Sequence, residues 1–382
     1  MENLTPAILA GINLDRRCCE KDHASLDELG LLAETAGFEA KLKVLQHRER
    51  IDPAWYMGVG QARQIRHLVT ENGIQAVIFD FELSPVQLRN LEEILKVRII
   101  SRTELILEIF AKRAHTKEAK LQVELATLNY ALPRLRHMWP HLNRIVGGNR
   151  TRGPGEKQLE MDRRRLAARI GKIKKDLVSV RKHRVEIRKR RQYMNRIALV
   201  GYTNAGKSSL LNTLAHATLY TESKLFATLD PATREVWLGD GVKALATDTV
   251  GFIRRLPHTL VASFRSTLEE VRDSDLLLHV VDVSSPDAGE QIEAVQEVLR
   301  EIEAHTMPVF YVFNKADLLN GRHVKLSLLR KYENHALVSA KTGEGIDWLK
   351  ASLREFFLEL SMNRQRQRDE EHAHAAVVSL KD

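Results

Sequence analysis

The segment at 201–208 constrains the fold of this chain more than any other. It reads Gly-Tyr-Thr-Asn-Ala-Gly-Lys-Ser and matches the pattern G-x-x-x-x-G-K-S. An apolar run, IALV, precedes it, and the amphipathic run SSLLNTL begins at its last residue. A glycine-rich turn between an apolar strand and a helix is typical of open parallel sheets. The sequence therefore predicts an α/β fold with a doubly wound, mostly parallel sheet in this part of the chain.

This segment also has the chemistry of a phosphate site. Backbone N–H groups of the turn, and the positive end of the helix behind it, can bind phosphate oxygens. The ammonium of Lys207 can reach the β and γ phosphates, and the hydroxyl of Ser208 can bind Mg²⁺. The candidate nucleotide contacts are therefore Gly201, Tyr202, Thr203, Asn204, Ala205, Gly206, Lys207 and Ser208.

A second segment, Asp248-Thr249-Val250-Gly251, follows the apolar run VKALAT. An acidic group at the end of a neighbouring strand suits a position near Mg²⁺. A glycine three residues later lets its N–H approach the γ phosphate without a side chain in the way. We expect these four residues to contact the nucleotide, with Lys207, Asp248 and Gly251 taking part in catalysis.

Two further segments indicate which base is bound. Asn314-Lys315-Ala316-Asp317 follows PVFYVF, and Ser339-Ala340-Lys341 follows ALV, so both are expected where ligands bind in open α/β sheets. The carboxylate of Asp317 can accept hydrogen bonds from N1–H and N2–H₂ of guanine, whereas adenine would leave it unpaired. Asn314 can support the loop, and the second segment can give a backbone N–H to guanine O6. These seven residues are candidate contacts to GTP or GDP.

The positive charge of the chain is concentrated in one segment. Residues 150–191 contain 17 Lys and Arg against 5 Asp and Glu, a net charge of +12, while the other residues carry 42 against 45, a net charge of −3. Such a concentration indicates a polyanionic partner, most often a nucleic acid. A solvated helix with a basic bias is the alternative interpretation.

The pattern of apolar residues divides the chain into four parts. Short apolar runs alternate with amphipathic ones from 1 to 101, which predicts a small α/β domain. From 102 to 194 the spacing is helical and heptad-like, with a glycine-rich stretch at 137–157, so we expect an antiparallel helical hairpin with this loop at its tip. The alternation returns from 195 to 360, and the tail at 361–382 is expected to lack regular structure.

Several classes of protein are excluded by composition. No apolar run is long enough to span a bilayer, and the N-terminus has no basic region before its short apolar stretch, so we expect a cytoplasmic protein without a signal peptide. Cys18 and Cys19 are the two cysteines, which is too few for a disulfide framework or a four-cysteine zinc site.

Together these motifs resemble the translational GTPases, and more narrowly the HflX family, whose members bind and split ribosomes. The resemblance is carried by LFATLDPATR, DTVGFIRRLPHTLVASFRSTLEEV and VVDVSSP in the GTPase part, and by ELSPVQLRNLE, EIFAKRAHT, LQVELATLNYALPRL and RGPGEKQLEMDRRR before it. The last two stretches, LQVELATLNYALPRL and RGPGEKQLEMDRRR, are much more specific to the family than any GTPase motif. One departure is Lys157, because the family usually has Thr there, at the expected tip of the hairpin.

The resemblance implies further site residues and partners. It implies that Phe226, Ala227, Thr228, Leu229 and Asp230 form the effector loop, with Thr228 as an Mg²⁺ ligand beside Ser208. Spacing alone does not choose Thr228 over Thr221 or Thr233. The implied partners are the large (50S) ribosomal subunit, the 70S ribosome and 23S-type rRNA, with the hairpin tip directed at the peptidyl transferase region, and we expect a monomer.

The sequence leaves three functions open. The favoured one is a Mg²⁺-dependent GTPase that binds the 50S subunit, splits 70S ribosomes and leaves on GTP hydrolysis. The alternatives are a GTPase acting in large-subunit assembly, or a non-catalytic, GTP-switched rRNA-binding protein. Phe252 follows Gly251 where many GTPases place a water-orienting Gln, so we expect slow basal hydrolysis that ribosomes stimulate.

Overall fold

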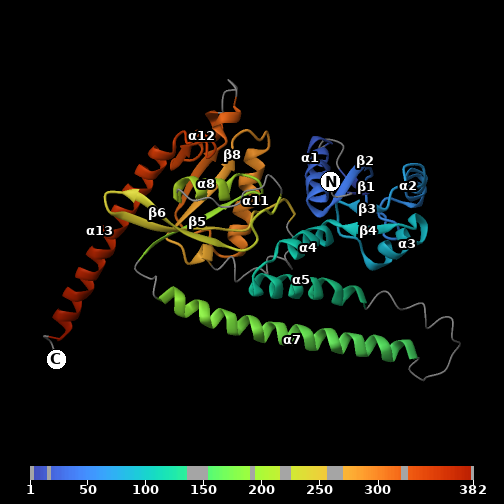
Figure 1. The fold of residues 1–382 in the computed structure, drawn as a ribbon, viewed down its shortest axis with the longest axis horizontal. Coiled ribbons are helices and arrows are strands. Elements are labelled where there is room, and N and C mark those ends of the chain that lie inside the picture. The colour runs from blue at the N-terminus through green and yellow to red at the C-terminus, as the bar shows by residue number, and fades with distance from the viewer. Residues whose placement is uncertain are drawn as a thin grey trace. The chain divides into compact units, whose positions relative to one another are not determined.

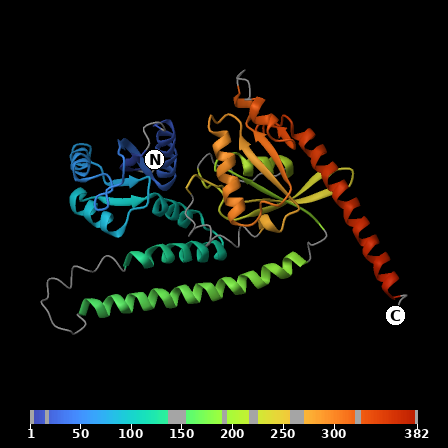
Figure 2. The same ribbon diagram turned by 180° about the vertical axis from the view of Figure 1, so that it is seen from behind.

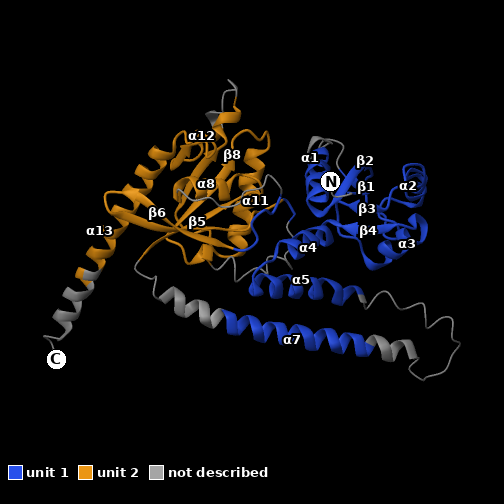
Figure 3. Ribbon diagram, in the orientation of Figure 1, with its two compact units in different colours: residues 1–186, 224–230, 254–265 blue, residues 187–223, 231–253, 266–382 orange. Residues whose placement is uncertain are grey.

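The chain folds around two separate sheets, one parallel and one mostly parallel, with one sheet in each of two units (Figures 1 and 3). Unit 1 comprises residues 1–186, 224–230 and 254–265, and unit 2 comprises residues 187–223, 231–253 and 266–382. The structure is a computed structural model, and it describes residues 4–14, 19–135, 154–189, 194–215, 225–255, 270–319 and 326–379. The segments 224–230 and 254–265 lie in unit 1, although the sequence placed them in the GTPase part.

Unit 1 begins as a small doubly wound α/β sheet. Its strand order is β2-β1-β3-β4, and all three pairings are parallel. Helices α2 and α3 pack on one face, and α1 and α4 pack on the other. The elements are β1 (Thr5–Asn13), α1 (Cys19–Ala36), β2 (Phe38–His47), α2 (Val59–Glu71), β3 (Ala76–Phe79), α3 (Pro85–Leu95), β4 (Arg98–Ser101) and α4 (Arg102–Arg113).

Local sequence signals explain where these helices begin and end. The hydroxyl of Ser84 accepts a hydrogen bond from the N–H of Gln87, and the Gln87 side chain accepts one from the N–H of Ser84. This capping box, with Pro85 in the first turn, starts α3. Helix α2 ends at Glu71 with Asn72 as its C-cap, and Gly73 turns the chain with a φ of 60°.

A helical hairpin continues unit 1, as the sequence predicted. Helices α5 (Lys117–Leu135) and α7 (Pro154–Lys189) lie side by side and run in opposite directions, which Figure 2 shows from behind. Their contact is an apolar seam. Leu125, Ile170 and Ile173 are buried in the seam, and Leu121, Leu128, Leu132 and Leu177 pack against them. The expected tip of the hairpin, at 137–157, lies mostly outside the described residues.

Unit 2 has the doubly wound, mostly parallel sheet that the sequence predicted. Its strand order is β10-β9-β8-β5-β7-β6, and β6 alone among these strands is antiparallel to its neighbour. Helices α8 and α13 cover one face, and α11 packs on the other. The elements are β5 (Asn195–Gly201), α8 (Lys207–Ala215), β6 (Ala232–Gly239), β7 (Val242–Asp248), β8 (Leu276–Asp282), α11 (Ala288–Glu301), β9 (Val309–Asn314), the 3₁₀ turn η2 (Ala316–Leu318), α12 (Leu326–Arg330), β10 (His335–Leu337) and α13 (Ile346–Ser379).

Two elements differ from the sequence expectation. Strand β6 was not expected, because it is a half-exposed edge strand in which only Val236 and Leu238 are buried. Helix α13 runs to Ser379, so the tail expected to lack regular structure is helical up to there. The tail is rich in Ala, Glu, Gln and Arg and has no Gly or Pro, and nothing in it stops the helix. No helix among the described residues is long and apolar enough to cross a membrane.

The hairpin seam supplies a stability prediction. Ile173 is fully buried, with no exposed surface, whereas Val178 on the same helix is 55% exposed. We expect Ile173→Ala to lower the free energy of unfolding by about 2–4 kcal/mol, because it leaves a cavity between α5 and α7. Val178→Ala is the matched control and should change it by less than about 0.5 kcal/mol. Urea denaturation followed by circular dichroism measures the free energy of unfolding of both variants. Equal losses in the two variants would contradict the conclusion that Ile173 is packed between α5 and α7.

Candidate nucleotide site

The predicted phosphate loop joins β5 to α8 at the carboxyl end of the strand. Gly206 has a φ of +92°, and a Cβ atom built there would lie 2.2 Å from Nδ2 of Asn314. A side chain is therefore excluded at this position. Asn204 also has a left-handed backbone, with a φ of 61°, which Asn tolerates better than most residues. The loop is thus a tight turn whose N–H groups precede a helix N-terminus, as a phosphate site requires.

The side chain of Lys207 lies across this loop. Its Nζ donates hydrogen bonds to the carbonyl oxygens of Gly201, at 3.2 Å, and Tyr202, at 2.9 Å. Burial lowers the pKa of Lys207 to about 8, and the nearby carboxylate of Asp248 opposes that shift. An ammonium held among carbonyls in a buried loop is well placed to exchange those partners for phosphate oxygens.

Ser208 and Asp248 meet at the end of β7. The Ser208 hydroxyl donates to Oδ2 of Asp248 at 2.5 Å, and Asp248 is 1% exposed. A hydroxyl and a buried carboxylate are oxygen ligands of the kind that Mg²⁺ prefers, and Mg²⁺ takes few protein ligands and keeps several waters. No cluster of three His, Cys, Asp or Glu side chains suited to a metal occurs among the described residues. The pair therefore fits Mg²⁺ bound together with phosphate, where the ion would neutralise developing charge.

The rest of the second motif is held by the core. Thr249 is fully buried, and its hydroxyl donates to the carbonyl of Leu199 at 2.6 Å, which ties β7 to β5. Val250 is also buried. A Cβ atom on Gly251 would lie 2.8 Å from Cγ2 of Thr203 and 3.0 Å from Nζ of Lys207. The structure thus brings Gly251 against the phosphate loop, and its contact with the γ phosphate stays a prediction.

The two base-recognition segments are joined by one side-chain amide. Nδ2 of Asn314 donates to the carbonyl of Ala205 at 2.9 Å, and its Oδ1 accepts from the N–H of Ala340 at 2.9 Å. Asn314 is 2% exposed; its bond to Ala205 is buried, and the bond from Ala340 is partly buried. The N–H of Ala340 therefore supports Asn314, and a hydrogen bond from this segment to guanine O6 stays a prediction.

Asp317 and Lys315 are positioned by neighbouring polar groups. Oδ1 of Asp317 accepts a hydrogen bond from the hydroxyl of Ser339 at 2.6 Å, and Ser339 is fully buried. Lys315 has a left-handed backbone, with a φ of 66°, and its Nζ lies 2.6 Å from Oδ2 of Asp282. Ala316 continues into the 3₁₀ turn, while Lys341 is exposed. The carboxylate of Asp317 is thereby held by Ser339, and its contact with guanine stays a prediction.

The expected effector loop lies in unit 1 and is held there. The ring of Phe226 packs edge-on against that of Phe110, with centroids 4.7 Å apart. The carboxylate of Asp230 accepts hydrogen bonds from the N–H groups of His115 and Thr116, at 3.0 and 3.1 Å. Leu229 is buried, and Ala227 and Thr228 are partly buried. Ligation of Mg²⁺ by Thr228 stays a prediction.

Sequence reasoning missed the residues that hold the segment after Gly251. Nη1 of Arg255 lies 3.2 Å from Oδ2 of Asp80, and its guanidinium lies 4.7 Å from the Phe81 ring. The guanidinium of Arg102 donates to the carbonyl of Arg254 at 3.3 Å. Asp80 directly follows β3, and a charged residue at the end of a buried strand is the one signal that could have marked it.

A second missed residue lies beneath the phosphate loop. His279 is 1% exposed on β8 and pairs in register with Val200 of β5. Burial lowers its pKa to about 3, and the charge of Lys207 lowers it further. His279 is therefore neutral at physiological pH and adds no charge near the phosphates. The apolar strand LLLHVVD gave no reason to single it out.

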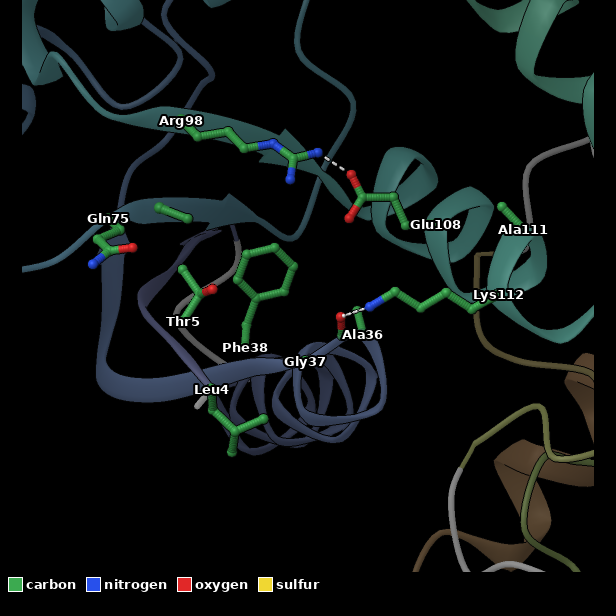
Figure 4. A pocket seen from close by; sticks show the side chains of 11 residues that line it. Leu4, Thr5, Ala36, Gly37, Phe38, Gln75, Arg98, Glu108, Ala111 and Lys112 are labelled. Atoms are coloured by element: carbon green, nitrogen blue, oxygen red, sulfur yellow. Dashed lines mark hydrogen bonds and ion pairs between the residues drawn. The ribbon is translucent and has the colours of Figure 1, made fainter. Parts of the chain in front are cut away.

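Unit 1 contains a pocket of about 710 Å³ that is separate from the nucleotide site (Figure 4). Leu4, Phe38, Gln75 and Arg98 line it at the amino ends of the four strands. An ion pair between Arg98 and Glu108 and a bond from Lys112 to the carbonyl of Ala36 cross its rim. Ligands of open α/β sheets bind at the carboxyl ends of strands, so this pocket is not the counterpart of the nucleotide site.

Comparison with known proteins agrees with this geometry. Three protein-family models match the chain: "GTP-binding GTPase N-terminal" at residues 23–111, "GTP-binding GTPase Middle Region" at 113–191 and "50S ribosome-binding GTPase" at 196–315. Among solved structures, the complex of SsGBP with GDP matches 94% of this chain and all of that one, with a TM-score of 0.50 and 26% identity.

Curated relatives match over most of their length. The GTPase HflX of Lacrimispora saccharolytica is 48% identical over 332 residues, which is 86% of this chain and 78% of that protein. The GTPase HflX of Escherichia coli is 45% identical, over 88% of this chain and 80% of that protein. The GTPase HflX of Magnetococcus marinus is 44% identical, over 94% of this chain and 85% of that protein.

The buried lysine gives the site a pH dependence. Phosphate binding needs protonated Lys207, and its pKa of about 8 in the free protein means that the proton is lost above that pH. We expect the Kd for GDP to rise about tenfold from pH 7 to pH 9, measured by fluorescence of a labelled GDP. Lys207→Arg stays charged over this range and should give a flat profile. A flat profile for the unaltered protein would contradict the prediction.

Proposed function

Because this chain belongs to the HflX family of GTPases, we propose that it binds the large (50S) ribosomal subunit in its GTP state and splits 70S ribosomes into subunits. Membership of the family already establishes that the protein is a GTPase. The protein binds GTP and GDP, hydrolyses GTP to GDP and phosphate with Mg²⁺ as cofactor, and carries a GTPase domain of the ribosome-binding type.

The basic outer face of α7 carries the proposal. Arg163, Lys172, Lys174 and Lys175 are exposed, and no ion pair to a described residue neutralises them. Helix α7 is held against α5 by the apolar seam, so these charges lie on a helix whose position in the hairpin is fixed. Such a face gives salt-dependent affinity for phosphate backbones, and 23S-type rRNA is the polyanion that a ribosome offers. Arg169 on the same helix differs, because it donates two hydrogen bonds to the carboxylate of Glu124 on α5 and so joins the two helices of the hairpin.

Binding energy, and not hydrolysis, does the splitting in this proposal. A protein that binds free 50S more tightly than 70S shifts the equilibrium toward free subunits by that difference in affinity. GTP sets the state that binds, and hydrolysis lets the protein leave. Residues 1–101, 102–194 and 195–360 then act as an N-terminal part, an rRNA-binding hairpin and a GTPase domain, with 361–382 as a tail. The protein acts as a monomer in the cytoplasm, partly bound to ribosomes.

Splitting can be tested by sucrose-gradient sedimentation of 70S ribosomes. With the protein and a non-hydrolysable GTP analogue, we expect 70S to convert to free subunits and the protein to migrate with 50S. Lys207→Ala removes the phosphate contact and is the control that should leave 70S intact. Intact 70S with the unaltered protein would refute splitting. Preferential binding to precursor large subunits would instead favour a role in assembly.

Ribosomes should also accelerate hydrolysis. The Phe252 ring is 2% exposed, and its backbone is fixed by a bond to the carbonyl of Gly201 at 3.1 Å. A buried phenyl ring cannot orient water, so the basal rate should be slow, and added 50S subunits should raise it by about tenfold or more. Release of phosphate with and without 50S measures this. A rate that ribosomes leave unchanged would contradict it, and negligible turnover even on ribosomes would favour a passive switch.

A further inference from the structure

The segment 225–230 holds the joint between α4 and α5. The carboxylate of Asp230 accepts hydrogen bonds from the N–H groups of His115 and Thr116, at 3.0 and 3.1 Å, and a third from the Thr116 hydroxyl. That hydroxyl accepts a bond from the N–H of Ala119 at 3.1 Å, so Thr116 caps the first turn of α5. Asp230 therefore binds the capping residue from which the helical hairpin starts.

Apolar contacts hold the same segment in a strained conformation. The ring of Phe226 is buried and packs edge-on against Phe110 near the end of α4, with centroids 4.7 Å apart. Leu225 and Leu229 are buried as well. Phe226 has a φ of 54°, a left-handed backbone that is strained for a residue with a Cβ atom. Such strain persists only where surrounding contacts impose it, and it is common in segments that switch between conformations.

The segment is also connected to the metal end of the nucleotide site by a short piece of chain. Ala232, at the start of β6, pairs in register with Asp248 of β7. Asp248 accepts a hydrogen bond from the Ser208 hydroxyl, and this pair fits Mg²⁺ bound together with phosphate. Only Pro231, whose ring fixes its φ, lies between Ala232 and Asp230. Two residues span at most about 7 Å, so a shift at the start of β6 reaches Asp230 directly.

We propose that Asp230 is a positioning residue that couples the nucleotide site to the helical hairpin. The segment 225–230 holds the start of α5, and binding of Mg²⁺ with the γ phosphate at Ser208 and Asp248 changes that contact. Coupling between two sites is reciprocal, so a partner on the hairpin changes the affinity for GTP by the same factor as GTP changes the affinity for the partner. For that partner, the 50S subunit, the inference rests on the proposed function.

Hydrogen–deuterium exchange of the full chain tests the coupling without a ribosome. With saturating Mg²⁺ and nucleotide, we expect amides of residues 115–120 to exchange at rates that differ by about fivefold or more between GDP and a non-hydrolysable GTP analogue. Asp230→Ala removes all three bonds to the joint, so the two rates should become equal. Asp230→Asn keeps an acceptor oxygen and should restore part of the difference.

The affinity for 50S subunits gives a second measurement. In the unaltered protein, the Kd for 50S should differ between the GDP and GTP-analogue states, and Asp230→Ala should reduce the ratio of these two Kd values by about fivefold or more. An anchor with a merely structural role would weaken both Kd values by one factor and leave their ratio unchanged, which would overturn the proposal.

Asp52→Ala is the matched control, because the Asp52 carboxylate also accepts two backbone N–H bonds, from Ala54 and Trp55 at 2.9 Å each, but in the turn before α2. It should keep both differences. Equal exchange rates in the unaltered protein would overturn the coupling, and so would an undiminished difference in Asp230→Ala. If 50S bound the unaltered chain in neither state while the exchange result held, the proposed function would fall and the coupling would stand.

Discussion

One buried amide holds the nucleotide site together. Asn314 donates to the carbonyl of Ala205 in the phosphate loop and accepts from the N–H of Ala340 in the loop after β10. The phosphate-binding and base-binding loops come from separate strands, and this side chain fixes their spacing. Gly206 has no side chain because Nδ2 of Asn314 occupies that space. Loss of the amide would leave the buried carbonyl of Ala205 unpaired, at a cost of about 1–3 kcal/mol, and would also remove the partner of the Ala340 N–H.

Buried charge plays the corresponding part in unit 1. The guanidinium of Arg102 is 3% exposed and lies 2.7 Å from Asp80 and 2.9 Å from Glu28. Removing one member of such a pair leaves an uncompensated buried charge, which is strongly destabilising. Asp80 also holds Arg255, and the chain passes from unit 2 to unit 1 between residues 253 and 254. Arg254 and Arg255 are therefore tied into the ionic centre of unit 1.

Much of this fold and site could be predicted from local patterns. The phosphate loop, the sheet around it, the capping box at Ser84 and the seam of α5 with α7 all follow from residue spacing. Strand β6 could not be found in this way, because its apolar run is only Val236-Trp237-Leu238, which is too short to indicate a strand, and the rest of the strand is polar or small. The extent of α13 was also missed, because a run of helix formers without a core contact gives no periodic signal.

The sequence by itself determined the chemistry of the site, because glycines, a lysine and carboxylates at fixed spacing have one common use beside a strand end. It also determined that a basic hairpin precedes the site. Only the tertiary structure decided which of those groups are already satisfied. Thr249 and Ala340 turn out to be bonded within the protein, while the hydroxyl of Thr203 is buried without a described partner. Hydrogen bonds between segments far apart in the chain depend on packing in three dimensions, and residue spacing carries no record of them.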